Sequence, residues 1–267
     1  MHCQHCGSKM KNTPTVKVSD LLALVQRDYR EKEKRSLYLV NLYINNQLLP
    51  YFGDRSAAYL LERNIDEYKD KRLGEGASKV TISRELQVLK RGFNLGLKRR
   101  LIKTAPFIEL FPEPEPREGH YEYEEFLKFI EVARSIPASK NFDGQVVADI
   151  VYFAYFSGWR LSECLGLHKD WIKVKEQLAI LPAKKHKNKR PKILPLDGEL
   201  WELVSLRLSQ CNNDGLLFHR NGKPIKSIRR LCLTICQSVG IDSAHFFHNL
   251  RRSFRTNLGR AGIDDQT

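Results

Sequence analysis

Apolar residues recur every three or four positions through the first hundred residues, which is the period of a helix with one buried face. The pattern begins at Val16 and is clearest after Ser78, where five residues form a single stripe: Ile82, Leu86, Leu89, Phe93 and Leu97. We therefore predict four or five helices in a small all-α domain over residues 14–104, after a polar tail at residues 1–13.

Prolines interrupt the helical pattern in the middle of the chain. Pro112, Pro114 and Pro116 alternate with glutamates, and each proline disfavours the helical conformation in the residue before it. A segment of this kind is extended and fairly stiff. Residues 105–119 are therefore predicted to link two domains.

The second half of the chain combines helical patterns with two short apolar runs. Residues 146–156 are almost wholly apolar, which predicts a buried helix. Residues 178–181 and 193–196 predict the two strands of a hairpin, and helical patterns resume after them. The fold class is thus mainly α, with a second domain at 120–267 that is mostly helical around a small β-hairpin. No apolar run approaches a bilayer span, so we expect no membrane partner and a cytoplasmic, nucleoid-associated location.

Charge changes this picture, because it is large and unevenly distributed. Lys and Arg number 45 against 31 Asp and Glu, a net charge of +14. Residues 69–103 hold eleven basic and three acidic side chains, and residues 220–260 hold nine basic and one acidic. Residues 106–131 have the opposite balance, with two basic and eight acidic side chains. Such segregation favours a polyanionic partner over a merely basic soluble protein. We predict two DNA-binding surfaces joined by an acidic connector that does not bind DNA.

Two sets of cations are candidates for contacts with DNA phosphates. The polar face of the helix after Ser78 is almost purely cationic, which favours phosphate contacts over an ordinary solvated face. The predicted hairpin loop is more basic still, with six Lys or Arg among the nine residues 184–192. The candidates are Arg84, Lys90, Arg91, Lys98, Arg99, Lys184, Lys185, Arg190 and Arg252.

Cysteines offer a weaker signal. Cys3 and Cys6 have the spacing of half a zinc knuckle, but no second Cys-x-x-Cys follows to complete four ligands. The other four cysteines are interpreted as reduced packing residues. We expect no metal and no cofactor, and we keep a zinc-dependent DNA-binding regulator as a minor alternative.

Candidate chemistry begins at the break Ser157-Gly158, after the predicted buried helix. Arg160 opens the next helix and Glu163 follows one turn later, so the carboxylate can hold the guanidinium in one pose. A fixed guanidinium is a planar fork of donors that suits phosphate oxygens. Alone, such a pair is more often a solvated salt bridge of small energetic value.

A second pair strengthens the first. His248 and Arg251 lie one turn apart on a predicted helix face. Two arginines, a histidine and a choice of lysines in one basic domain suit phosphoryl transfer on DNA, because guanidinium groups can neutralise the non-bridging oxygens at a crowded phosphorus. A histidine can move a proton, and a lysine can donate one to a departing oxygen.

These residues lie in motifs that resemble those of the tyrosine recombinases, the phage integrase family. Ser157-Gly-Trp-Arg-Leu-Ser-Glu163 is similar to the family's first arginine motif, usually Thr-Gly-x-Arg-x-Ser-Glu. His248-Asn-Leu-Arg251 is similar to its His-x-Leu-Arg motif, with Asn249 where aspartate is usual. Tyr51-Phe-Gly-Asp54 and the segment after Gly76 resemble the family's helical core-binding domain, so the resemblance spans roughly residues 14–262.

The resemblance implies a fold and a role for each residue. The fold would be a SAM-like core-binding domain followed by a catalytic domain of the DNA breaking-rejoining type, incomplete at its C-terminal end. Arg160 and Arg251 would stabilise the transition state, Glu163 would orient Arg160, and His248 would assist proton transfer. The family also places a proton-donating lysine on the β-hairpin, and counting back from the Leu-Pro-Leu strand selects Lys187, with Lys184 and Lys185 left open.

The resemblance also implies the partners. Both domains would clamp double-stranded DNA, and the protein would form a homo-oligomer, a tetramer on DNA in intact relatives, with no small-molecule substrate. The reaction would be DNA integration or recombination at a specific site through a phosphotyrosyl intermediate, as expected of a mobile element.

One departure from the family bears on activity. The family's attacking tyrosine lies some tens of residues after the His-x-x-Arg motif, whereas sixteen residues follow Arg251 and the last of ten tyrosines is Tyr155. We therefore expect a chain truncated before its nucleophile and inactive as it stands. The alternative is a non-catalytic DNA-binding remnant that only occupies attachment sites.

Overall fold

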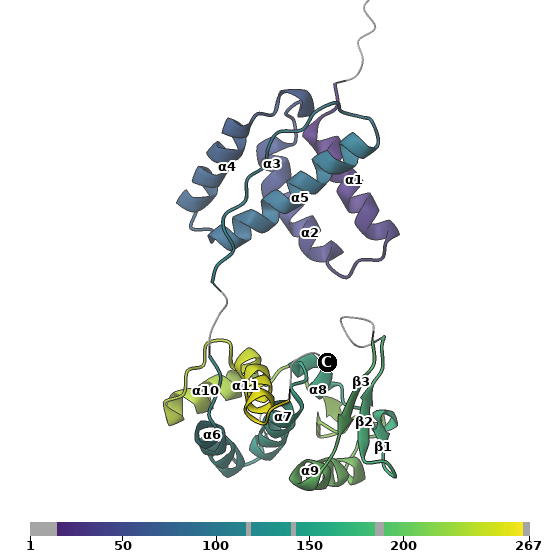
Figure 1. Ribbon diagram of the computed structural model, residues 1–267, viewed down its shortest axis with the longest axis vertical. Coiled ribbons are helices and arrows are strands. Elements are labelled where there is room, and N and C mark those ends of the chain that lie inside the picture. Colours follow the sequence, from purple (N-terminus) through teal and green to yellow (C-terminus); the bar gives the residue numbers. More distant parts are fainter. Residues whose placement is uncertain (1–14, 116–118, 140–142, 185–189, 264–267) are drawn as a thin grey trace, which may run out of the picture. The chain divides into compact units, whose positions relative to one another are not determined.

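The computed structural model describes residues 15–115, 119–139, 143–184 and 190–263 (Figure 1). The chain divides into two compact units, residues 1–116 and 117–267. The division falls inside the segment 105–119 that the prolines mark as a linker. Each unit has its own hydrophobic core and is described by itself.

Unit 1 is all helical, as predicted. Its elements are α1 (Val18–Glu31), α2 (Leu37–Tyr43), a π-helical turn η1 (Ile44–Leu48), α3 (Leu49–Phe52), a 3₁₀ turn η2 (Ala57–Tyr59), α4 (Glu62–Gly74) and α5 (Lys79–Lys98). The side chain of Ser78 caps α5 by accepting a hydrogen bond from the backbone N–H of Thr81 at 3.2 Å.

Helix α5 buries the predicted stripe against α1. Ile82, Leu86, Leu89 and Phe93 are buried in the core of the unit, and Leu97 at the end of the stripe is half-buried. Gly96 lets the two helices approach, because a Cβ there would lie 2.7 Å from the Leu21 side chain. Close packing of α5 on α1 therefore requires both the missing side chain at Gly96 and the Leu21 side chain that fills the space.

A buried carboxylate joins α4 to α5. Glu85 accepts hydrogen bonds from Arg72 Nε at 3.0 Å, from Arg72 Nη2 at 2.8 Å and from the Tyr68 hydroxyl at 2.8 Å. A buried charge is tolerated only when it is paired and fully hydrogen-bonded. Removal of Arg72 would therefore leave the Glu85 carboxylate without its cationic partner inside the unit, whereas Arg72 also pairs with Glu75.

The first part of the predicted linker packs onto unit 1. Ile108 is buried, the backbone N–H of Phe111 donates to Ser83 Oγ at 3.1 Å, and Lys90 Nζ donates to the carbonyl of Ile108 at 3.4 Å. The segment has no helix or strand, as the prolines predict, but residues near Ile108 belong to the core of this unit.

Unit 2 is mostly helical around a small antiparallel sheet. Its elements are α6 (Tyr123–Ser135), α7 (Gly144–Ser157), α8 (Leu161–Leu165), a 3₁₀ turn η3 (Lys169–Trp171), β1 (Ile172–Lys173), β2 (Leu178–Leu181), β3 (Lys192–Pro195), α9 (Gly198–Ser209), β4 (His219–Arg220), β5 (Lys223–Pro224), α10 (Arg229–Val239) and α11 (Phe246–Arg260). The predicted hairpin is β2–β3, with Ala179 opposite Leu194, and β1 extends it to three strands. The sequence patterns missed β1 and the separate two-stranded sheet of β4 and β5.

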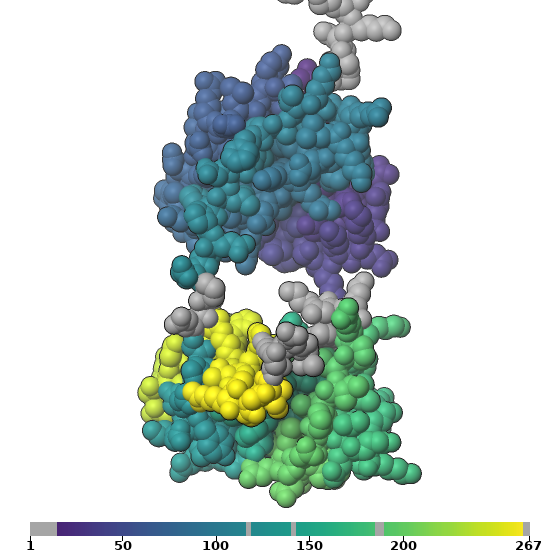
Figure 2. Space-filling model, in the orientation of Figure 1, coloured from purple at the N-terminus to yellow at the C-terminus, as the bar shows by residue number. Residues whose placement is uncertain are grey.

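Helix α7 lies at the centre of unit 2 and is buried along almost its whole length, as its composition predicts. Helices α6 and α11 both pack against it (Figure 1), and Phe126 of α6 stacks on Tyr155 with ring centroids 4.0 Å apart. The one buried carboxylate of α7, Asp149, accepts a hydrogen bond from Arg207 Nε at 2.7 Å. Helix α11 also forms part of the surface of unit 2 (Figure 2).

The end of α7 requires glycine. Gly158 has a φ of +58°, in the left-handed region that residues with a Cβ adopt at a cost. A Cβ on Gly158 would also lie 2.4 Å from the Phe254 ring of α11. This residue therefore sets both the exit of the chain from α7 and the close contact of that turn with α11.

Among the described residues, no helix has both the length and the apolar character needed to cross a bilayer.

We expect Gly158→Ala to lower the free energy of unfolding of unit 2 by about 2–4 kcal/mol, the sum of left-handed strain and overpacking against Phe254. Gly240→Ala is the matched control, since Gly240 caps α10 with a φ of +72° and has nothing within 4 Å of its Cβ position. The control should lose only about 1 kcal/mol. All three tryptophans lie in unit 2, so urea unfolding followed by tryptophan fluorescence reports on this unit. Equal losses in the two variants would contradict a role for the Phe254 contact.

Candidate functional site

Arg160 stands at the junction between the α7 turn and α8. It is the residue before the first turn of α8, and its backbone N–H donates to Glu163 Oε2 at 2.9 Å. Its guanidinium Nη1 donates to the other oxygen of the same carboxylate, Oε1, at 3.0 Å. The contact predicted from the spacing of these two residues is therefore present. Arg160 keeps 35% of its side-chain area exposed, whereas Glu163 keeps 4%, so the carboxylate is buried behind an accessible cation.

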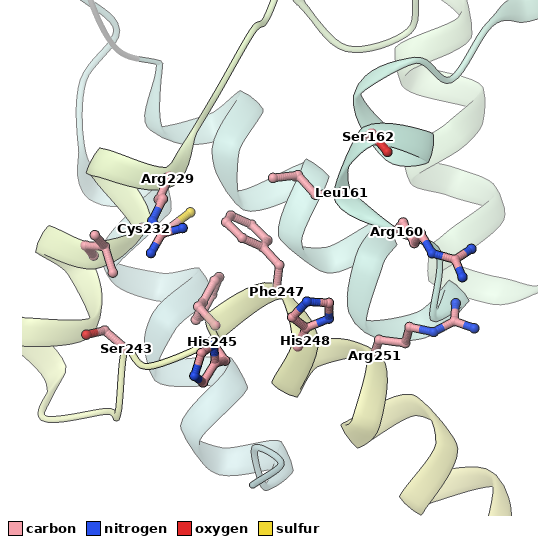
Figure 3. Close-up of a pocket in the computed structure, with 12 residues that line it drawn as sticks. Arg160, Leu161, Ser162, Arg229, Cys232, Ser243, His245, Phe247, His248 and Arg251 are labelled. Atoms are coloured by element: carbon pink, nitrogen blue, oxygen red, sulfur yellow. The ribbon is translucent and has the colours of Figure 1, made fainter. Parts of the chain in front are cut away.

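Arg251 reaches the same turn from the other end of the unit's sequence. It lies on α11, and its Nη1 donates to the carbonyl oxygen of Gly158. Figure 3 shows the guanidinium groups of Arg160 and Arg251 pointing the same way from two different helices. Both line a pocket of about 370 Å³. Residues 91 positions apart in sequence thus present two cations to one space.

His248 lies one turn before Arg251 on α11 and lines the same pocket. Its side chain is exposed. The rest of the lining is mixed, with apolar side chains and further polar groups at its edge: Leu161, Ser162, Arg229, Cys232, Leu233, Ser243, His245, Phe246 and Phe247. The pocket therefore combines cationic donors with an apolar floor, and Arg229 is a cation that the sequence patterns did not single out.

Lys192 is the other residue that sequence analysis missed. Its Nζ lies 3.3 Å from Glu163 Oε2 and 5.8 Å from the centre of the Trp159 ring. Burial lowers the pKa of Lys192, and the charges of Arg251 and Arg160 lower it further, although Glu163 opposes them. Alternation along β3 could have found it, because Lys192 lies two residues before the buried Leu194 and so shares its face.

The Glu163 carboxylate is the acceptor that these cations share. Burial by itself would raise its pKa, but the Arg160 backbone N–H, the Lys192 ammonium and the Arg160 guanidinium together hold the pKa below the ordinary glutamate value of 4.5. Glu163 is therefore ionised at neutral pH.

The predicted lysines of the hairpin loop fall partly outside the described residues. Lys185 and Lys187 lie outside the described residues, as do Cys3 and Cys6. Lys184 and Arg190 are described, and both are exposed. In the described ranges, no group of three or more His, Cys, Asp or Glu side chains could hold a metal ion.

The basic residues predicted on α5 differ in their surroundings. Arg84, Lys98 and Arg99 are exposed, and so is Lys90, which also reaches the Ile108 carbonyl. Arg91 instead donates from Nη2 to Asp28 and lies over the Tyr29 ring, 5.0 Å from its centre. Hydrogen bonds from Lys32 and Arg91 lower the pKa of Asp28 to about 2, so this carboxylate already compensates the charge of Arg91.

Asn249 occupies the position where the resemblance leads one to expect aspartate. Its amide Nδ2 donates to the carbonyl of Ala244 at 3.2 Å, and its Oδ1 accepts from Arg252 Nη1 at 3.3 Å. Arg252, a candidate DNA contact, is thus also part of the local structure at the start of α11. An amide fits here because it both donates and accepts.

Comparison with known proteins places this geometry in a family. The family model described as "Phage integrase family" matches residues 120–267. Tyrosine recombinase XerC of Lactobacillus leichmannii is 25% identical over 204 residues, which cover 72% of this chain and 67% of the relative. The XerC of Bacillus subtilis (strain 168) is 22% identical over 203 residues, 71% of this chain and 65% of the relative. The chain thus spans about two thirds of the length of these curated relatives.

Solved structures agree on the fold. The Tn1549 transposon integrase, solved with circular intermediate DNA, superimposes with a TM-score of 0.72 at 17% identity, covering 94% of this chain and 89% of that one. A lambda integrase tetramer bound to a Holliday junction gives 0.74 at 15% identity, with 97% and 80% covered. The matched family model covers more than half of this chain and includes both arginines of the pocket, so the chain belongs to the phage integrase family, the tyrosine recombinases.

Proposed function

We propose that this chain binds duplex DNA and that Arg160 and Arg251 receive a phosphate of the DNA backbone, as required for site-specific recombination through a phosphotyrosyl intermediate. The observation that carries the proposal is that Arg160, just before α8, and Arg251, on α11, line one pocket and point their guanidinium groups the same way (Figure 3). Each is fixed by a separate acceptor, Glu163 or the Gly158 carbonyl. Two oriented forks of donors suit the non-bridging oxygens of a phosphate better than two mobile cations do.

Each further residue has a role that follows from its chemistry. Glu163 holds Arg160 in its pose, and His248, exposed one turn from Arg251, moves a proton at the phosphate. A lysine of the loop between β2 and β3 protonates the departing 5′ oxygen, and Lys187 is our choice by its register before the strand.

Contacts outside the pocket would supply most of the affinity. Arg84, Lys90, Lys98 and Arg99 on and just after α5, Lys184 and Arg190 beside the loop, and Arg252 on α11 are accessible or partly accessible cations. Such groups neutralise phosphates irrespective of base sequence. The Tn1549 and lambda integrases, which this chain resembles in fold, were solved on DNA, and one lambda integrase structure is a tetramer bound to a Holliday junction. We include self-assembly on DNA in the proposal on that similarity.

We expect the affinity for duplex DNA to fall by orders of magnitude between about 50 and 200 mM salt, because several phosphate contacts release counterions. Replacing Lys98 and Arg99 by Gln should reduce the slope of log affinity against log salt by about 2, since each lost contact removes about 0.9. The control replaces Arg27 and Arg30 on α1, which removes the same charge from the same unit. Fluorescence anisotropy at five salt concentrations measures the slopes. A salt-independent affinity, or equal slopes for the two double variants, would contradict the proposed surface.

We expect Arg160→Lys to lose contact with one phosphate while keeping the others, because lysine retains the charge but not the fork. A duplex selected from random sequences for binding would be ethylated at single phosphates, and the bound and free fractions compared. With wild-type protein, ethylation of one phosphate should interfere strongly with binding. With Arg160→Lys, ethylation of the same phosphate should no longer interfere. Arg134→Lys, an exposed arginine on α6, is the control and should leave the pattern unchanged. Identical patterns for the wild type and Arg160→Lys would remove Arg160 from the site.

We expect the 267-residue chain to form no covalent adduct with a nicked duplex that traps phosphotyrosyl intermediates. Tyr121, Tyr152 and Tyr155 of unit 2 are buried and burial raises the pKa of each hydroxyl, so none of these three is a ready nucleophile. The fourth tyrosine of the unit, Tyr123, is exposed, but it does not line the pocket of Arg160 and Arg251. Denaturing gel electrophoresis of labelled DNA detects an adduct, and binding of the same duplex under native conditions is the control. An adduct would refute this expectation, and mass spectrometry would identify the attacking tyrosine. Binding without an adduct would agree with the alternative of a protein that only occupies its sites.

A further inference from the structure

Lys192 lies beside Glu163 and Arg160, and the proposed chemistry gives it no role. It is the first residue of β3, and strand alternation turns its side chain to the same face as the buried Leu194. Its side chain keeps only 22% of its area exposed. A partly buried lysine loses hydration, and this loss must be compensated by a specific partner.

The partner is Glu163. The Lys192 ammonium lies 3.3 Å from Oε2, the same oxygen that accepts the backbone N–H of Arg160, while Oε1 accepts the Arg160 guanidinium. Both oxygens of the carboxylate are therefore used, and they are used by residues of two elements, β3 and α8. This clamp ties the base of the lysine loop to the residue that presents Arg160.

We infer that Lys192 is a positioning residue for Arg160 that acts through Glu163. The inference rests on the proposed function, since it concerns how the same pocket binds a phosphate. With Lys192 in place, the carboxylate is held from two sides and can bind only one edge of the Arg160 guanidinium, which leaves the other donors of that group for a phosphate. Without Lys192, the buried carboxylate would keep Arg160 as its ion-pair partner among the described residues, and would draw the whole guanidinium towards itself.

The site-specific probe is inorganic phosphate, followed by the side-chain Nε–H resonance of Arg160 in ¹⁵N-labelled full-length protein. The resonance is assigned by its absence in Arg160→Lys. In the wild type we expect it to shift on titration with phosphate. In Lys192→Met, which keeps the length of the side chain without its charge, the phosphate concentration at half-shift should rise about tenfold, the effect of one charge-assisted hydrogen bond. Lys192→Arg should restore the wild-type value within about twofold.

A second comparison separates positioning from direct contact with the phosphate. If Lys192 acts through Glu163, then Lys192→Met should cost little in a Glu163→Gln background, because the acceptor that it positions is gone. A full tenfold loss in that background would show that Lys192 binds phosphate itself and would overturn the inference. An unchanged titration in the single variant Lys192→Met would overturn it as well.

The two levels of the proposal fail in different ways. If the Arg160 resonance of the wild type does not shift on titration with phosphate, the proposed function and the inference are both contradicted. If the resonance shifts at the same phosphate concentration in the wild type and in Lys192→Met, the inference alone is contradicted. Tryptophan fluorescence must show that unit 2 of each variant is folded, and if Lys192→Met is not, Lys192→Gln takes its place with the same expected loss.

Discussion

A buried carboxylate must find compensating charge, and in unit 2 this requirement organises the whole site. Glu163 can remain ionised behind the pocket only because Arg160 and Lys192 surround it. The first comes from the turn after the central helix and the second from the base of the hairpin, so one carboxylate sets the mutual position of a helix, a turn and a sheet. The same contacts make Arg160 accessible on one side and fixed on the other.

The second constraint is steric. The turn at Gly158 carries no side chain, so the Phe254 ring fits against it and α11 lies close enough for Arg251 to reach the Gly158 carbonyl. Packing and hydrogen bonding thus act at the same residue. Two arginines from distant parts of the sequence need such a contact to present their guanidinium groups to one pocket, because an arginine side chain by itself has too many rotamers to hold one pose.

The sequence predicted the parts of this structure that depend on local spacing. The stripe on α5 and the Arg160–Glu163 contact follow from spacings of three or four residues, and the buried α7 and the β2–β3 hairpin follow from continuous apolar runs. Contacts between distant segments were not predicted, because no local pattern specifies them. Arg91 looked like any other cation of α5, yet it is engaged by Asp28, 63 residues away. Lys192 looked like one more basic residue of the loop. Alternation along β3 places it on the face of the buried Leu194, but no local pattern identifies Glu163, 29 residues earlier in the chain, as its partner.

Asn249 has a consequence for how the site responds to acid. Because the start of α11 is fastened by an amide that bonds to the Ala244 carbonyl and to Arg252, neither hydrogen bond at this side chain depends on a carboxyl group that titrates. An aspartate here would have no proton to give the Ala244 carbonyl at neutral pH, and would gain one only in acid. The hydrogen bonds of Asn249 at the start of the helix that carries His248 and Arg251 are therefore the same in acid and at neutral pH, so the support that this side chain gives the helix does not depend on protonation.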